Sequence, residues 1–444
     1  MEARRLAAVV SLILTWGLLA ALVAGCGIVR YASPQGAEAR SEPIRLTLLH
    51  NWTGLDAKSL AMRRILDEFR ASHPDVRLED VGLPTDVMKV RLRTLAAADE
   101  MPDLFVMWPE SMTRDFVKGG LLQPVNELLD RNPEWRDRFI PHAFDGYTVD
   151  GNVYSVPMNL APTSILYYNQ ALFDRYGVKV PETWDEMMTA VRVFNEHRVI
   201  PIALGNKANW VVQSTIFSTL ADRITGTEWF LQAVNQDGAR FTDPPFIAAL
   251  KLLQNFGKAG AFQPGFHLID DHQMMQLFID GKAAMFFNGG WATSYIVQNM
   301  PQEALAHTHV GIMPAIPGGK GEERSVSGVV GTGLGVNRKL DGAAKEAALD
   351  LFYALSGPEG QAATLASSTL VSYRLEPDRS QAHPLFLELY DLIGSVRLSP
   401  VYDNSLSLSA VEVINSGLQD VLLGGNVYKV AQQLQDTQAA AVGK

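Results

Sequence analysis

Residues 281–291 read GKAAMFFNGGW, and they contain a turn, a strand and a loop in that order. Gly281 follows an apolar helical segment, Ala283 to Phe287 form an apolar run typical of a buried strand, and Trp291 comes after two glycines. A helix followed by a buried strand is the repeating unit of α/β proteins. The indole comes just past the strand, which in open α/β sheets is the edge where ligands bind. The stretch therefore predicts an α/β fold with a ligand site at the carboxyl edge of a sheet.

The arrangement of an apolar strand followed by a tryptophan occurs three more times. The runs IRLTLL, DLFVM and PIAL are followed closely by Trp52, Trp108 and Trp210, with Asn, Glu or Gly nearby. A pyranose has an apolar C–H face on which an indole can stack, and a rim of hydroxyls that Asn, Glu and Asp can bind. The four loops therefore predict a carbohydrate site.

Each of these indoles could instead fill a core or plug a loop, and that alternative stays open. Trp135, Trp184 and Trp229 do not follow strands in this way, and we interpret them as packing residues.

Strands and helices alternate along most of the chain. In the first series, strands 44–49, 76–81 and 103–107 alternate with helices 56–71, 85–98 and 111–118. A second series contains strands 164–168, 200–204 and 283–287, a helix from a capping box at 183–186 to residue 197, a Gly-rich strand region at 329–336, and helices 342–355 and 406–423. This alternation predicts largely parallel sheets with helices on both faces. About 400 residues exceed one comfortable core, so we expect two domains or lobes.

Composition excludes several classes of function. The formal net charge of -10 argues against nucleic acid as a partner, because no basic surface offers counterion release. The chain is 19% charged and 47% hydrophobic, which is typical of a folded protein. A single cysteine can form neither an internal disulfide nor a zinc site. The sequence contains no Walker A, H-E-x-x-H or G-x-S-x-G motif, so we expect no cofactor, no metal and no enzymatic activity.

The amino-terminal residues have the pattern of a secretory signal. Arg4 and Arg5 precede an uncharged apolar run over 6–25, and Val-Ala-Gly-Cys ends it at Cys26. This end resembles the bacterial lipobox, which predicts a signal peptide over 1–25 and a diacylglycerol on the Cys26 sulfur. Residues 26–43 would form a flexible tether. The alternative is an uncleaved membrane anchor, since about 20 apolar residues can span a bilayer.

Several motifs together resemble the extracellular solute-binding proteins of ABC importers, family 1, the group related to the maltose-binding protein. They are GKAAMFFNGGW at 281–291, VYSVPMNLAPTSILYYNQALFDRYGVKVPETWDEM at 153–187, PDLFVMW at 102–108 and GIMPAIPGG at 311–319. The resemblance runs from about Leu46 to the helical carboxyl terminus. It implies a two-lobed periplasmic-binding-protein fold of type II, with the ligand in a cleft between hinged lobes.

The resemblance also implies boundaries and site residues. Lobe one would comprise residues 44–155 and 285–335, and lobe two residues 160–280 and 340–444, with crossings near 157–162, 281–285 and 333–337. The expected ligand-binding residues are Trp52, Trp108 and Glu110 from lobe one, Trp210 from lobe two, Asn288, Gly290 and Trp291 from one loop, and Asn159 and Asp403 as further candidates.

The implied function is capture of a mono- or oligosaccharide and its delivery to a membrane permease. The protein would act as a monomer on the outer face of the cytoplasmic membrane, held there by lipid. Three alternatives remain: a non-sugar solute, for which Lys207 is the one cation near a tryptophan loop; a glycan-acting enzyme using Asp270 and Asp271; and a metal site adding His267 and His272. The sequence does not specify the sugar or the permease.

Overall fold

The computed structural model describes residues 43–443. The predicted signal peptide, Cys26 and nearly all of the predicted tether lie outside the described residues. The contacts of Ile44–Lys444 make them one unit, separate from the preceding residues. Across the described residues, no helix combines the length and apolarity needed to cross a membrane.

The first lobe is built on a four-stranded sheet of order β12-β3-β1-β2. Its strands are β1 (Ile44–His50), β2 (Val76–Gly82), β3 (Leu104–Met107) and β12 (Gly333–Val336). β1 pairs in parallel with both β2 and β3, and β12 runs antiparallel to β3. All of β3 is buried, as expected for the centre of a sheet covered on both faces.

Helix α2 (Ala57–Ser72) confirms the helix predicted over 56–71. The Asp56 side chain caps it by accepting from the Ser59 N–H, and Met62, Leu66 and Phe69 lie on its buried stripe. The helix α3 (Thr85–Ala98) then connects β2 to β3. The other elements that precede the second lobe are α4 (Ser111–Lys118), α5 (Asn126–Arg131), α6 (Pro133–Arg136), the 3₁₀ helix η1 (Asp145–Tyr147), β4 (Thr148–Val149) and β5 (Asn152–Val153).

The second lobe contains a mixed sheet of order β10-β7-β9-β8. Its strands are β7 (Ile165–Asn169), β8 (Ile200–Ala203), β9 (Ala283–Asn288) and β10 (Thr308–Gly311). Only β8 and β9 are parallel, so this sheet is less parallel than the alternation of elements predicts. The predicted capping box at Thr183 and Glu186 is confirmed, and it opens α8 (Trp184–Glu196).

The helices of the second lobe fill most of the remaining chain. They are α7 (Gln170–Tyr176), α9 (Trp210–Val212), the π-helical turn η2 (Gln213–Phe217), α10 (Ser218–Thr225), α11 (Thr227–Asn235), α12 (Pro244–Lys258), α13 (Asp271–Ile279), α14 (Ala292–Asn299), α15 (Gln302–Leu305), α18 (Pro384–Gly394), α19 (Tyr402–Ser405), α20 (Leu408–Leu422) and α21 (Val427–Ala441).

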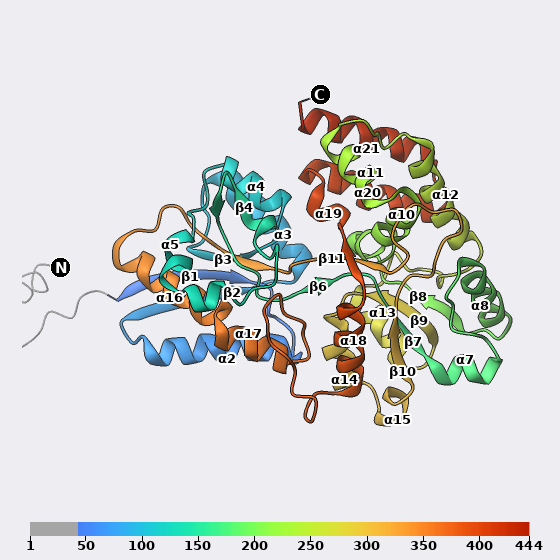
Figure 1. Cartoon of the computed structure of the whole chain (residues 1–444), viewed down its shortest axis with the longest axis horizontal. Helices are drawn as coiled ribbons and strands as arrows, with labels where there is room; N and C mark the ends of the chain where they lie inside the picture. Colours follow the sequence, from blue (N-terminus) through green and yellow to red (C-terminus); the bar gives the residue numbers. More distant parts are fainter. Residues whose placement is uncertain (1–42, 444) are drawn as a thin grey trace, which may run out of the picture. The chain divides into compact units, whose positions relative to one another are not determined.

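A small third sheet lies between the lobes (Figure 1). It has the order β13-β11-β6, from β6 (Ala161–Pro162), β11 (Ser325–Val329) and β13 (Arg397–Ser399). The chain leaves lobe one through β6 and returns from β11 to β12. The predicted Gly-rich strand over 329–336 is therefore two strands, one in this sheet and one in the sheet of lobe one.

The expected lobe boundaries are wrong for two segments. β9 and β10 belong to lobe two and not to lobe one, because β9 is hydrogen-bonded between β7 and β8, and β10 is hydrogen-bonded to β7. Conversely, α16 (Gly342–Ser356) packs on β1 and α2, and α17 (Pro358–Ala366) packs on α2, so both belong to lobe one. There is accordingly no crossing near 281–285, and the third crossing lies between α17 and α18, which packs on β10.

Candidate functional site

Strand pairing places the four tryptophan loops in two groups. β1 and β3 are parallel neighbours in the first sheet, so the loops that carry Trp52 and Trp108 leave the same edge. β8 and β9 are parallel neighbours in the second sheet, so the loops that carry Trp210 and Trp291 do the same. Parallel strands end at a common edge, and this explains why residues far apart in the sequence become neighbours.

Trp210 and Trp291 lie side by side in lobe two. Their ring centroids are 6.3 Å apart at an interplanar angle of 53°. Asn209 adopts a left-handed conformation (φ 64°), which Asn tolerates, and thereby starts α9 at Trp210. Trp291 immediately precedes α14, and both indoles are half-buried. The pair forms a two-ring aromatic wall.

Trp52 has a different environment. Its side chain is 3% exposed, and its ring stacks on the His50 ring at 4.8 Å. The Arg63 guanidinium donates to its backbone carbonyl. The indole N–H is buried and has no acceptor among the described residues. A ligand-binding role for Trp52 stays a prediction, and its ring is not part of the aromatic wall.

Trp108 lies at the junction of the lobes. Its half-buried ring has the Lys89 ammonium 4.8 Å from the centroid, within the range of a cation–π interaction. The same ammonium pairs with the Asp403 carboxylate of α19 at 3.2 Å. The second oxygen of Asp403 has no partner within the described part of the chain. Two expected site residues from different lobes thus meet through a lysine that the sequence analysis did not select.

Glu110 has an unusual backbone conformation. Its φ of 66° and ψ of -109° are rare for a residue with a side chain, and such residues concentrate at functional sites. The Glu110 N–H donates to the Gly146 carbonyl, and its carboxylate accepts from the Ser405 hydroxyl at 2.7 Å. Burial raises the pKa of Glu110, and the nearby Asp403 adds to the rise, whereas the Ser405 hydrogen bond and the Arg114 charge oppose it.

The remaining expected site residues are held by hydrogen bonds to the backbone, two of them to distant segments. Asn159 accepts from the N–H and the hydroxyl of Thr332 through its side-chain oxygen, so it joins the first crossing to the chain before β12. Asn288 is buried, and its side-chain oxygen accepts from the Gly289 N–H, while its side-chain nitrogen has no partner among residues 43–443. Gly290 donates its N–H to the Pro162 carbonyl in the first crossing.

The acidic and histidine cluster that suggested a metal site has structural roles. Asp270 caps α13 and completes a capping box with Gln273. Burial raises the pKa of Asp271. The His272 ring contacts the Tyr295 ring at 5.2 Å. Within residues 43–443, no group of three or more His, Cys, Asp or Glu side chains is arranged to hold a metal ion.

Sequence reasoning missed three polar residues of this region. They are Lys89, Asn209 and Asn415. The side-chain oxygens of both asparagines are buried without a partner in the described residues, and α20, which carries Asn415, packs on α9 next to Asn209. Asn209 could have been selected, because it directly precedes Trp210. Lys89 and Asn415 lie within ordinary amphipathic helices, so their sequence context gives no signal. Only the fold shows that Lys89 contacts Trp108 and that the helix of Asn415 packs on α9.

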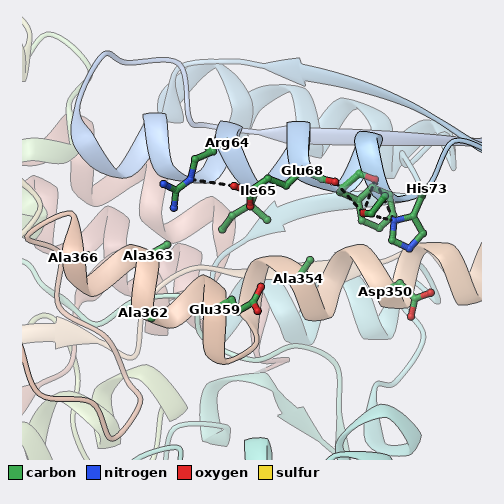
Figure 2. A pocket seen from close by; sticks show the side chains of 12 residues that line it. Arg64, Ile65, Glu68, His73, Asp350, Ala354, Glu359, Ala362, Ala363 and Ala366 are labelled. Carbon is green, nitrogen blue, oxygen red and sulfur yellow. Dashed lines mark hydrogen bonds and ion pairs between the residues drawn. The ribbon is translucent and has the colours of Figure 1, made fainter.

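The structure also has a groove elsewhere, on the helices of lobe one (Figure 2). It encloses about 750 Å³ between α2 and the pair α16–α17, and Ala354, Ala362, Ala363 and Ala366 line one side. Arg64 and Glu68 form an ion pair along the opposite side. None of the residues that line this groove follows a strand, so it is separate from the tryptophan loops.

The two lobes, the crossing strands and the loops at the sheet edges define a periplasmic-binding-protein fold of type II. Residues 54–362, more than half of the chain, match the family described as bacterial extracellular solute-binding protein. The chain belongs to this family.

Relatives and solved structures agree with this assignment. The multiple sugar-binding protein of Streptococcus mutans is 22% identical over 291 residues, and a mannitol-binding protein of Pseudomonas aeruginosa is 27% identical over 264. These matches cover 64% and 57% of this chain, and 65% and 58% of the relatives, so the chain spans somewhat less than two thirds of each.

Two solved structures match over most of the chain. One comes from work on xylan utilization by Caldanaerobius polysaccharolyticus, with 27% identity, a TM-score of 0.81, and coverage of 89% of this chain and 100% of that one. The other is a chitin oligosaccharide binding protein, with 24% identity, a TM-score of 0.82, and coverage of 89% and 99%.

Proposed function

We propose that this protein captures a carbohydrate outside the cell and delivers it to the permease of an ABC transporter. The observation that carries the proposal is the aromatic wall of Trp210 and Trp291 beside buried polar atoms that lack partners. Flat apolar rings next to free hydrogen-bonding groups match the two kinds of surface on a sugar. Family membership and the sugar- and polyol-binding relatives support the same ligand class.

The proposed site draws on both lobes. Trp108 and Glu110 contribute from lobe one, and Trp210, Trp291 and Asp403 from lobe two. Asn288, Gly290, Trp52 and Asn159 complete it around these five. Contacts made to both lobes at once favour the arrangement with the lobes together, so ligand shifts the population toward it. The action is binding, without chemistry on the ligand.

The proposal includes a location. Lipid on Cys26 would hold the protein at the outer face of the cytoplasmic membrane, where the short tether raises its effective concentration near the permease. Without residues 1–25, which carry Glu2, Arg4 and Arg5, the net charge changes from -10 to -11. We expect an acidic monomer that binds no nucleic acid.

Calorimetric titration tests the ligand class. We expect heat and a thermal shift with at least one member of a panel of monosaccharides, oligosaccharides and polyols. Trp210→Ala and Trp291→Ala should each weaken that binding by roughly tenfold, since an aromatic stack contributes about 0.5–1.5 kcal/mol beyond its buried area. The control is Tyr428→Ala, which removes an exposed ring of α21. Absence of heat with every member, or unchanged affinity in both tryptophan variants, contradicts the proposal.

A further inference from the structure

The lobes touch each other directly along one edge of the candidate site. α3 and α4 of lobe one meet α19 and α20 of lobe two. Lys89 pairs with Asp403 at 3.2 Å, and Arg93 pairs with Glu412 at 2.7 Å. Figure 1 shows α3 and α4 on the side of lobe one that carries these contacts.

The charges on the two sides are complementary. Lys89 and Arg93 are four residues apart on α3, so they lie on one face of that helix. Their partners Asp403 and Glu412 come from two consecutive helices of lobe two. In both pairs the cation is on lobe one and the anion on lobe two, so separation of the lobes breaks the two pairs together. The Glu110 carboxyl of lobe one also lies near Asp403 and opposes this attraction when it is ionised.

The two pairs differ in how much they contribute. The side chains of Lys89 and Asp403 are 27% and 8% exposed, whereas those of Arg93 and Glu412 are 34% and 62% exposed. An exposed ion pair contributes little because water and salt screen it, and a partly buried pair is screened less. Lys89 is therefore the residue through which most of this attraction acts.

Lys89 also contacts one proposed ligand-binding residue from each lobe. Its ammonium group lies over the Trp108 ring and pairs with Asp403, two residues proposed to bind the sugar. A side chain that holds an aromatic platform of one lobe against a carboxylate of the other fixes the distance between them. Within residues 43–443, no other cation both lies over the Trp108 ring and pairs with the Asp403 carboxylate.

We infer that Lys89 is a positioning residue that couples the approach of the lobes to ionic strength. Lys89 acts through its contacts with Trp108 and Asp403. The attraction between Lys89 and Asp403 favours the arrangement with the lobes together even when no ligand is bound. Its effect on affinity rests on the proposed function, whereas its effect on lobe separation does not. The affinity for a neutral ligand should consequently fall as salt concentration rises.

Small-angle X-ray scattering of the protein alone tests the effect on lobe separation. Between about 20 mM and about 500 mM NaCl, where the screening length falls severalfold, the wild-type radius of gyration should increase. Lys89→Met should start at the larger radius and respond little to salt, and Lys89→Arg should restore the wild-type response. Because Lys89→Met leaves the Asp403 charge buried without its partner, the double variant Lys89→Met/Asp403→Asn is measured as well, and it should show the same loss of salt response.

The matched control is Arg192→Gln, which removes an ion pair with Glu196 inside α8 and should leave the salt response intact. Thermal unfolding checks that every variant is folded. If the double variant keeps the wild-type radius of gyration and salt response, the inference is overturned.

If a sugar ligand is found, its dissociation constant should rise about two- to tenfold over this salt range in the wild type and stay constant in the double variant. Should no sugar bind, the proposed function fails while the scattering result still decides the role of Lys89.

Discussion

At the scale of single residues, Gly289 is the position that sets the orientation of Trp291. A Cβ atom built on Gly289 would lie far inside van der Waals contact with three atoms of the Trp291 ring. The backbone there does not have a positive φ, so the requirement for glycine comes from the ring and not from the chain conformation. The indole occupies this position only because the neighbouring side chain is missing.

We therefore expect Gly289→Ala to turn the Trp291 ring away from Trp210. Sugar affinity should fall about tenfold, since an aromatic contact of roughly 1 kcal/mol is lost along with its geometry. Stability should change little, because the ring is the far end of a side chain that can rotate. Titration calorimetry and thermal unfolding measure the two effects. The matched control is Gly394→Ala at the end of α18, where a Cβ meets no atom within 4 Å, and where both quantities should stay at the wild-type values.

The comparison of Trp52 with Trp291 shows what sequence can predict about a site. Both follow an apolar strand, and the alternation of strands and helices correctly predicts that their loops leave sheet edges. Whether the ring then faces outward depends on neighbours from other segments, such as His50 against Trp52 and Gly289 beneath Trp291. The positive φ of Glu110 and the contact of Lys89 with Trp108 likewise have no signal in the local sequence.

At the scale of elements, local sequence signals predict where helices and strands lie better than they predict which strands pair with one another. The helix predicted over 56–71 and the capping box at Thr183 are both confirmed. The assignment of β9 to lobe one is wrong because pairing with β7 joins residues more than 100 positions apart. Apolar patterning shows that β9 is buried, but it contains no information on which sheet buries it.

Arg223 of α10 connects that helix to the segment that leads into β11, and its contacts can be tested by substitution. Its buried guanidinium donates to the carbonyls of Met313, Glu322 and Ser325, in the segment that leads into the crossing strand β11. Burial lowers the pKa of Arg223 to about 10, so the group stays charged at neutral pH, with Asp222 and the glutamates nearby opposing the shift.

Replacement by Met should lower the free energy of unfolding by about 3 kcal/mol, because several buried carbonyls lose a charged donor at once. Lys should not restore stability, since one ammonium cannot reach the same set of acceptors. Urea unfolding followed by circular dichroism measures the change. Arg192→Met, at an exposed position of α8, should alter stability by less than about 0.5 kcal/mol, and an equal loss there would show that the buried contacts of Arg223 are not the cause.

At the scale of the whole molecule, the two lobes are connected by the crossing strands and by the polar contacts along the edge of the site. Opening of the lobes leaves the core of each sheet intact, since each lobe has its own buried strands. The groups that change environment on opening are those covered from the opposite lobe. Glu110 is one of them, because Ser405 and Asp403 of α19 lie against it.

The raised pKa of Glu110 therefore predicts a pH dependence of lobe closure. Burial is the main cause, so the arrangement with the lobes together binds the Glu110 proton more tightly than an open, solvated one. The resulting stabilisation is fully present below the ordinary Glu pKa of 4.5 and is lost as pH rises through the raised value. Lowering the pH from 7 toward 5 should thus reduce the radius of gyration measured by scattering, and strengthen the binding of a neutral ligand.

Glu110→Gln cannot ionise but can still accept from Ser405, so the variant protein should stay compact across this pH range. The control is Asp115→Asn, in the helix α4 that follows Glu110. The raised pKa of Asp115 also arises from burial, with Arg114 and Lys118 of α4 opposing it, and removal of this carboxyl should leave the closure profile unchanged. A Glu110→Gln protein that still closes on acidification would assign the effect to another group.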